Sequence, residues 1–348
     1  MDARSSRPEA ESRYIHAASA SPTPIPQRLP RMVSRASTEA RRRASTVATL
    51  WLLAVTFGGV GYALGAYSYP RGLWPISLVR EILEPRPAGR QDELGRQVSF
   101  PGKVAIPCPR QTARTAVLLA LGQSNIGNHG AASFATRHPA NVVNYFAGRC
   151  YAAASPLLGS TGQGGEYLTP LADRLVESGS FDDVVLIPAA VGATNIQRWK
   201  DGGDVLDAVL RELPATLRRF RITAVLWHQG ESDVPLRTSA RNYAESFASM
   251  VAALGRAGVR APVYVAVASK CGLVDEWNPR NPVAMAQRRL IDGKAVRLGV
   301  DADALLDPAD RAADGCHLSA RGQLRTASAF ASAIVRYQQR DQAASVRR

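Results

Sequence analysis

Five short apolar runs, separated by stretches of helical periodicity, constrain the fold of this chain more than any other feature. The runs lie at residues 116–121, 184–187, 222–227, 263–268 and 304–306, and none contains proline. The helical patterns occupy residues 167–177, 205–220, 239–257, 282–298 and 320–338. Buried strands that alternate with amphipathic helices are typical of a parallel sheet covered on both faces. We therefore predict one three-layer α/β domain at residues 114–340, followed by a short tail at 341–348.

An uncharged apolar stretch at residues 44–69 is long enough to cross a bilayer core, which takes about 20 residues. Arg41, Arg42 and Arg43 precede it, and only Arg71 follows closely. This asymmetry predicts a transmembrane signal-anchor with a cytoplasmic N-terminus and all later residues outside the cytoplasm. A cleaved signal peptide and a buried core helix are the alternatives, and the long leader before the stretch favours the uncleaved anchor.

The segments on either side of this stretch have no apolar period. Residues 1–43 are rich in Ser, Pro, Arg and Ala, which predicts a disordered basic tail. Residues 70–113 contain several prolines, and we predict a linker there. The whole chain carries 43 Lys+Arg against 29 Asp+Glu, a net charge of +14. Because much of the excess lies in the tail, we expect no nucleic-acid partner.

Four cysteines, Cys108, Cys150, Cys271 and Cys316, occur without a C-x-x-C motif. This excludes the usual zinc-ribbon and thioredoxin-type patterns. Outside the cytoplasm, an even number of cysteines permits one or two disulfides. Four buried free thiols are the alternative, and the spacing does not determine the pairing.

Polar segments follow several of the predicted strands, where the sites of parallel sheets gather. Ser124 follows the first strand and offers a hydroxyl nucleophile, with its N–H near a helix start; a plain helix N-cap is the alternative. Asp314 stands three residues before His317 and can hold that imidazole as a general base. Gly192 follows the second strand and Gln229 the third, and both offer N–H donors to a developing oxyanion.

The other histidines fit this constellation less well. We interpret them as solvated or structural; they are His16, His129, His138 and His228. The sequence has no P-loop, no G-x-G-x-x-G after a strand and no H-E-x-x-H, so we expect no metal, nucleotide or redox cofactor.

Four blocks, taken in order, resemble those of the SGNH-hydrolase superfamily. They are GQSN at Gly122–Asn125, VGATNIQRW at Val191–Trp199, WHQGESD at Trp227–Asp233 and DGCHL at Asp314–Leu318. The resemblance covers residues 114–335 and is nearest to the sialate O-acetylesterase-like and acetylxylan-esterase-like carbohydrate esterases. It implies a three-layer α/β/α sandwich with a parallel, flavodoxin-like sheet.

The resemblance also implies a catalytic set. Ser124 would be the nucleophile, His317 the base and Asp314 its orienting carboxylate. The Ser124 N–H, the Gly192 N–H and the Gln229 side chain would form the oxyanion hole. Further candidates for substrate binding are Asn125, Asn195, Trp199 and Glu231. Trp199 could instead belong to the core, and we favour a structural role for Glu231 and Asp233 as supports of the Gln229 loop.

The expected function is therefore a membrane-anchored carbohydrate O-acetylesterase that acts outside the cytoplasm on an acetylated sugar or polysaccharide. Two alternatives stay open: an O-acetyltransferase that uses the same acyl-serine, and a non-hydrolytic glycan-binding protein. The sequence does not indicate the glycan or the oligomeric state.

Overall fold

The computed structural model describes residues 89–272, 278 and 280–347, together with Thr56, Gly58 and Gly61. The predicted basic tail (1–43) lies outside these residues, as do almost all of the predicted anchor (44–69) and the first part of the predicted linker. Within the described part of the chain, no helix is long and apolar enough to span a membrane. The described fold belongs to the compact unit Pro85–Arg348.

An eight-stranded sheet of order β10-β9-β8-β4-β7-β5-β6-β3 forms the centre of this unit. Its six strands from β10 to β5 are mutually parallel, and the edge pairs β5–β6 and β6–β3 are antiparallel. The bounds are β3 Ala105–Ile106, β4 Thr115–Gly122, β5 Val142–Phe146, β6 Arg149–Ala152, β7 Asp183–Pro188, β8 Ala224–His228, β9 Val263–Val267 and β10 Val296–Asp301. The predicted α/β fold with a mostly parallel sheet is confirmed.

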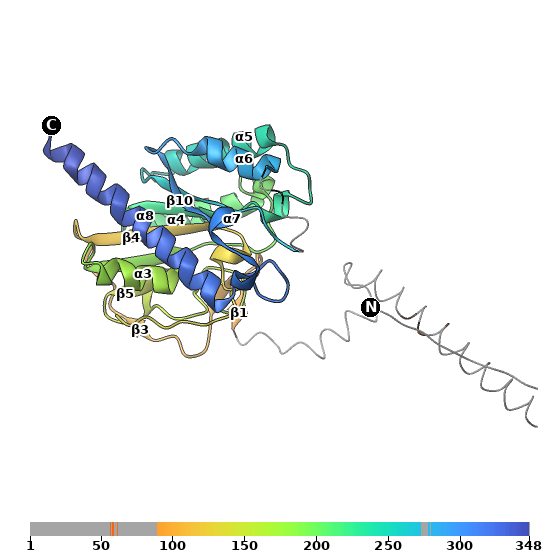
Figure 1. Cartoon of the computed structure of the whole chain (residues 1–348). Coiled ribbons are helices and arrows are strands. Elements are labelled where there is room, and N and C mark those ends of the chain that lie inside the picture. Colours follow the sequence, from red (N-terminus) through yellow and green to blue (C-terminus); the bar gives the residue numbers. More distant parts are fainter. Residues whose placement is uncertain are drawn as a thin grey trace, which may run out of the picture. The chain divides into compact units, whose positions relative to one another are not determined.

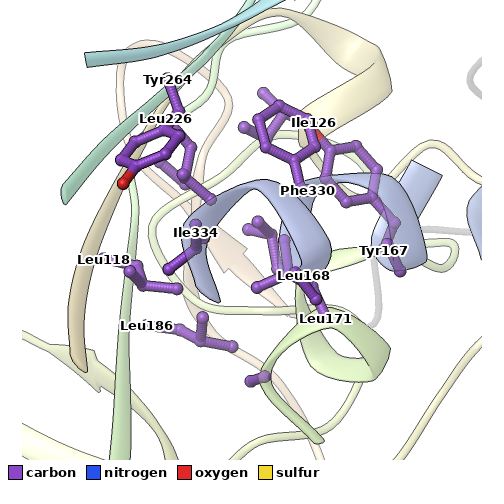
Figure 2. Packing of buried hydrophobic residues seen from close by; sticks show 14 of the residues in the cluster. Leu118, Ile126, Tyr167, Leu168, Leu171, Leu186, Leu226, Tyr264, Phe330 and Ile334 are labelled. Atoms are coloured by element: carbon purple, nitrogen blue, oxygen red, sulfur yellow. The ribbon is translucent and has the colours of Figure 1, made fainter. Parts of the chain in front are cut away.

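Helices cover both faces of the sheet, as Figure 1 shows, and strand β4 explains why. All eight residues of β4 are buried, so both of its faces require a cover. Leu118 faces a core shared with α3 (Leu168–Glu177) and α8 (Ala320–Val346), whose packing Figure 2 shows. Leu119, its neighbour, faces the opposite core. The helices on that side are α4 (Asp204–Leu217), α5 (Ala240–Arg256) and α6 (Pro282–Leu290).

Helix starts follow local side-chain chemistry. Ser239 caps α5 by accepting the N–H of Asn242, and Ser319 caps α8 by accepting that of Gly322. Asn281 caps α6, whose first residue is proline. Helix α8 continues to Val346, so most of the predicted C-terminal tail (341–348) is helical.

The core of the sheet has the flavodoxin-like strand order that the resemblance implies. Numbered along the chain as 1 to 5, strands β4, β7, β8, β9 and β10 run 2-1-3-4-5 across the sheet. The first strand, β4, therefore pairs with both β7 and β8. Strand β5 was not predicted, and it adds a sixth parallel strand on the outer side of β7.

Two strand predictions also need correction. The last parallel strand is β10, whose first three residues fall in the helical pattern predicted at 282–298. Residues 304–306, predicted as the last strand, fall at the short helix α7 (Ala302–Leu305) and its C-cap. The β5–β6 hairpin was not predicted. Its two-residue turn, Ala147-Gly148, has φ of 47° and 83°, as a type I′ turn requires.

Residues 89–113, expected in the linker, belong to the folded unit. They form β1 (Arg90–Gln91), β2 (Gln97–Ser99) and β3, and a disulfide joins Cys108 to Cys150 in β6. The second disulfide joins Cys271 to Cys316. These strands are two or three residues long, too short for an apolar period to reveal them.

Candidate active site

Ser124 lies where β4 ends, at the middle of the sheet. Gly122 has φ of +135°, and a Cβ there would lie 2.1 Å from the carbonyl oxygen of His228. Only glycine therefore lets β4 turn so close to β8. Ser124 then begins the single-turn helix η1 (Ser124–Ile126), where a helix leaves its first N–H groups without an intrahelical partner.

Asp314 and His317 lie in the loop before α8. Asp314 Oδ2 is 2.6 Å from His317 Nδ1, and Asp314 Oδ1 accepts the N–H groups of Cys316 and His317 at 2.9 Å each. Burial alone would raise the pKa of the Asp314 carboxyl. These hydrogen bonds and the charge of the His317 ring outweigh burial and lower that pKa. Asp314 is therefore a carboxylate held against one edge of the imidazole.

One cavity of about 480 Å³ brings three of the predicted residues together. It is lined by Gly95, Gln123, Ser124, His129, Thr161, Gly192, Ala193, Ser232, Cys271, Cys316 and His317. Ser124, Gly192 and His317 thus share one solvent-filled space, with Asp314 behind His317. This arrangement supplies a hydroxyl, an imidazole with a carboxylate partner, and backbone N–H groups.

Gly192 has a hydrogen-bond partner in this cavity. Its N–H donates to Thr161 Oγ1 at 2.8 Å, and His129 Nε2 lies 3.0 Å from the same hydroxyl oxygen. The His129 ring stacks on that of His317, with centroids 5.4 Å apart and planes 16° from parallel. A small polar network therefore connects the Gly192 N–H to the face of the His317 imidazole.

The structure does not bring the Gln229 side chain into this cavity. Gln229 is fully buried, and its amide nitrogen donates to Thr194 O at 2.9 Å and to Asp233 Oδ2 at 2.5 Å. Asp233 also accepts the N–H of Ile196 and the hydroxyl of Thr238. In this geometry Gln229 and Asp233 fix the segment that follows Gly192, and the amide offers no free donor to an oxyanion.

Asn125 and Glu231 form a buried pair beneath the site. Asn125 Nδ2 donates to Glu231 Oε1 at 2.8 Å and to the carbonyl of Cys316 at 3.2 Å. Burial would raise the pKa of the Glu231 carboxyl, but the hydrogen bond and charge of His228 and the hydrogen bond of Asn125 lower it to about 2. Both side chains support the loops of Ser124 and His317, and neither lines the cavity.

Two further predicted substrate contacts have structural roles instead. Trp199 is fully buried, and its ring packs edge-on against Trp227 with centroids 5.3 Å apart. It is core, the alternative left open above. Asn195 caps the short helix η2 (Ile196–Arg198) by accepting the N–H of Gln197 at 3.0 Å.

His129 and Thr161 are the residues of the polar network at the cavity that the sequence analysis did not predict. Thr161 lies in a loop with no motif of its own, and His129 was interpreted as solvated or structural. The one available signal in the sequence is the position of His129, five residues after Ser124. So short a segment keeps His129 close to the nucleophile in space.

Comparison with known proteins agrees with this geometry. Residues 114–336 match the family described as "carbohydrate esterase, sialic acid-specific acetylesterase". No curated protein matches the chain in sequence. Among solved structures, a protein from Arabidopsis thaliana is 22% identical, with a TM-score of 0.50, and covers 65% of this chain and 98% of its own.

Two bacterial structures are more distant. The psychrotrophic esterase EstA from Pseudoalteromonas sp. is 15% identical over 64% of this chain and 98% of its own, with a TM-score of 0.42. Est24, a carbohydrate acetylesterase from Sinorhizobium meliloti, is 16% identical over 63% of this chain and 98% of its own, with a TM-score of 0.39.

The fold and the cavity define an ester hydrolase built on a mostly parallel sheet. The chain belongs to the sialic acid-specific acetylesterase family of carbohydrate esterases.

Proposed function

We propose that this protein removes O-acetyl groups from a sugar or polysaccharide through an acetyl-serine on Ser124. The observation that carries the proposal is the shared cavity. Ser124 and His317 line it together, and Asp314 holds the far edge of the His317 ring at 2.6 Å. A serine hydroxyl beside an oriented imidazole is the arrangement that acyl transfer requires.

The steps follow from these positions. His317 Nε2 takes the proton of Ser124 as the hydroxyl oxygen bonds to the acetyl carbon. The tetrahedral intermediate collapses, the bond to the sugar oxygen breaks, and His317 returns the proton to that oxygen. Water then gives a proton to His317 as its oxygen bonds to the acetyl carbon. The bond between that carbon and Ser124 Oγ breaks, His317 returns the proton to Oγ, and acetate leaves.

The negative charge on the carbonyl oxygen needs donors at the carboxyl end of β4. We assign the Ser124 N–H and the Gly192 N–H to this role. The Gly192 N–H donates to Thr161 Oγ1 in this structure. As the oxyanion forms, this N–H would either donate to both oxygens or give up its hydrogen bond to Thr161 in favour of the oxyanion. We assign Gln229 a positioning role, because its amide is bonded to Thr194 and Asp233.

Covalent labelling tests the nucleophile. We expect a fluorophosphonate ester to phosphonylate Ser124 and to inactivate the protein with one adduct per chain, found by peptide mass spectrometry. Ser232 lines the same cavity and is the matched control. The Ser124→Ala variant should carry no adduct and the Ser232→Ala variant should label normally. An adduct on Ser232 in the wild type would overturn the assignment.

We further propose that residues 44–69 anchor the protein, with its catalytic domain outside the cytoplasm. The uncharged stretch and its arginine-rich leading flank support this, as do two disulfides in the described domain, since disulfides persist in oxidising compartments. Protease added to intact cells should digest the domain and spare a tag on residue 1. Protection of the domain with loss of the tag would reverse the topology.

A further inference from the structure

The hairpin formed by β1 and β2 reaches the active-site cavity from outside the matched family domain. The two strands pair antiparallel, with Arg90 opposite Ser99, and both precede residue 114. Gly95, in the turn between them, lines the cavity with Ser124 and His317. A segment that the family match does not include thus forms part of the wall around the nucleophile.

Backbone hydrogen bonds hold the hairpin against the loop of Thr161. The N–H of Gln97 donates to Ser160 O, and its carbonyl accepts the N–H of Gly159, at 2.9 Å each. The fully buried Gln97 side chain donates to Gly162 O at 3.0 Å. Arg96 pairs with Thr161 in an antiparallel bridge. Arg96 and Gln97 of the hairpin therefore pair with this loop as an antiparallel strand pairs with its neighbour.

Arg96 fixes the turn of the hairpin to the domain. Its side chain is only 4% exposed, and its Nε donates to Asp92 Oδ2 at 2.7 Å. Its guanidinium also pairs with Glu212 on helix α4. A buried arginine held by two carboxylates keeps the turn in one place, because removing either carboxylate leaves a buried charge short of a partner.

The loop that the hairpin holds contains the hydroxyl that bonds the Gly192 N–H and His129. Ser124, Gly192 and His317, which act on the acetyl carbonyl, all come from the matched domain. The hairpin adds a wall beside them. Since every acetyl ester presents the same acetyl group, an added wall changes which alcohol portion the cavity admits.

We propose that the β1–β2 hairpin determines specificity by bounding the part of the cavity that takes the sugar. This inference rests on the proposed function. Gly95 is the position at which the wall can be altered, because a Cβ there meets only the Thr161 methyl group within 4 Å, at 3.8 Å. A larger side chain would extend the wall without displacing backbone.

Two glycines with nearly equal φ angles give a matched pair of variants. Gly95 has φ of +75° and Gly102, in the turn after β2, has φ of +77° with nothing within 4 Å of its Cβ position. Asparagine tolerates this left-handed backbone better than other side chains. Gly95→Asn and Gly102→Asn therefore bear similar strain, and only Gly95→Asn narrows the cavity.

The experiment uses the full chain and two esters. One is ethyl acetate, whose two-carbon alcohol portion is much smaller than a sugar ring, and the other is the fastest substrate among O-acetylated xylose, glucosamine and neuraminic acid. For Gly95→Asn we expect KM for the acetylated sugar to rise about fivefold or more, the size of one lost contact, with kcat/KM for ethyl acetate changed less than about twofold. Gly102→Asn should change neither by more than about twofold.

Unchanged sugar KM in Gly95→Asn, or an equal loss on both esters, would overturn the inference while wild-type activity upholds the proposed function. A wild type that releases acetate from no sugar ester would refute the proposed function, and the inference with it. If Gly95→Asn does not fold, Glu212→Gln is the second variant. It removes the charge of the half-exposed carboxylate that pairs with Arg96, which weakens the attachment of the turn, and it should raise the sugar KM in the same selective way.

Discussion

At the scale of single residues, the turn from Asp314 to His317 orients the proposed base. One carboxylate oxygen accepts two backbone N–H groups, and the other meets His317 Nδ1. A carboxylate at Nδ1 favours the tautomer with its proton there, which leaves Nε2 free to accept a proton. One face of the His317 ring stacks on the ring of His129. His317 is thus held at an edge and at a face.

His129 makes the native state sensitive to acid. Its pKa is lowered to about 4, from an ordinary 6.5, because burial and then the charge of His317 disfavour its protonated form. Between these two values the unfolded chain binds more protons than the folded one. The free energy of unfolding therefore falls as pH falls from about 6.5 to about 4, and His129 adds no further loss below that.

We predict that the free energy of unfolding of the His129→Gln variant falls less than that of the wild type between about pH 6.5 and about pH 4. The glutamine side chain can still form a hydrogen bond with Thr161. Urea midpoints at pH 7 and at pH 4.5 give the measurement. Carboxylates with lowered pKa, such as Glu231 and Asp314, lose stability in acid in both proteins, so the difference between the two isolates His129. Equal losses in wild type and variant would contradict the prediction.

The sequence allowed Ser124, Gly192 and His317 to be placed near one another, because each follows a strand or precedes a helix at the same sheet edge. The contact between Asp233 and the Gln229 amide agrees with the supporting role predicted for Asp233. The contact of that amide with the Thr194 carbonyl could not be predicted, because the two loops meet only when the domain packs. The role of Thr161 could not be predicted from the sequence either. Its role depends on a loop whose position is set by the hairpin and by β7, not by its own residues.

At the scale of secondary-structure elements, long buried strands were predictable and short or crowded ones were not. The apolar run of β4 requires cover on both faces, which predicts the layers. Strand β10 was not predicted because it follows α6 closely and includes the polar Arg297, so the helical pattern of α6 appeared to continue into the first three residues of β10. The five core strands follow the flavodoxin-like order that the resemblance implies, whereas the sheet's extension by β5, β6 and β3 was not predicted.

The disulfide Cys271–Cys316 is an element of the site, because Cys316 adjoins His317 and both cysteines line the cavity. Ser269, two residues before Cys271, donates its N–H and hydroxyl to the buried Asp303. The disulfide thus connects the loop of the base to a fixed point after β10. Cys108–Cys150 links β6 to the segment after β3 and does not line the cavity.

The two disulfides close loops of nearly equal separation, 45 and 42 residues. Removing either should cost about 4 kcal/mol of stability in the chain-entropy account. We predict that Cys271→Ala/Cys316→Ala also lowers kcat by about tenfold or more, because a small displacement of the base costs rate, whereas Cys108→Ala/Cys150→Ala keeps kcat. Thermal melts and initial rates, measured below both melting temperatures, separate the two effects. Equal kcat in both double variants would refute the prediction.

At the scale of the whole molecule, the matched family domain contains the residues of the proposed reaction. The residues before it contribute a part of the cavity lining that the family match does not include. The match begins at residue 114, yet strand β1 begins at Arg90, and Gly95 of the hairpin lines the cavity. Expression of the domain from residue 100 would remove β1, β2 and the anchoring Arg96. Assays of substrate preference therefore require the hairpin.

The most direct test of the account is acetate release from acetylated sugars and polysaccharides, with a deacetylated glycan present as a possible acceptor. The account predicts free acetate from the wild type and from Ser232→Ala. It predicts a loss of about 10³-fold or more for Ser124→Ala, which should still fold because the change removes a single hydroxyl at the first residue of η1. Acetate release by Ser124→Ala at the wild-type rate, or transfer of acetyl to the glycan without free acetate, would contradict it.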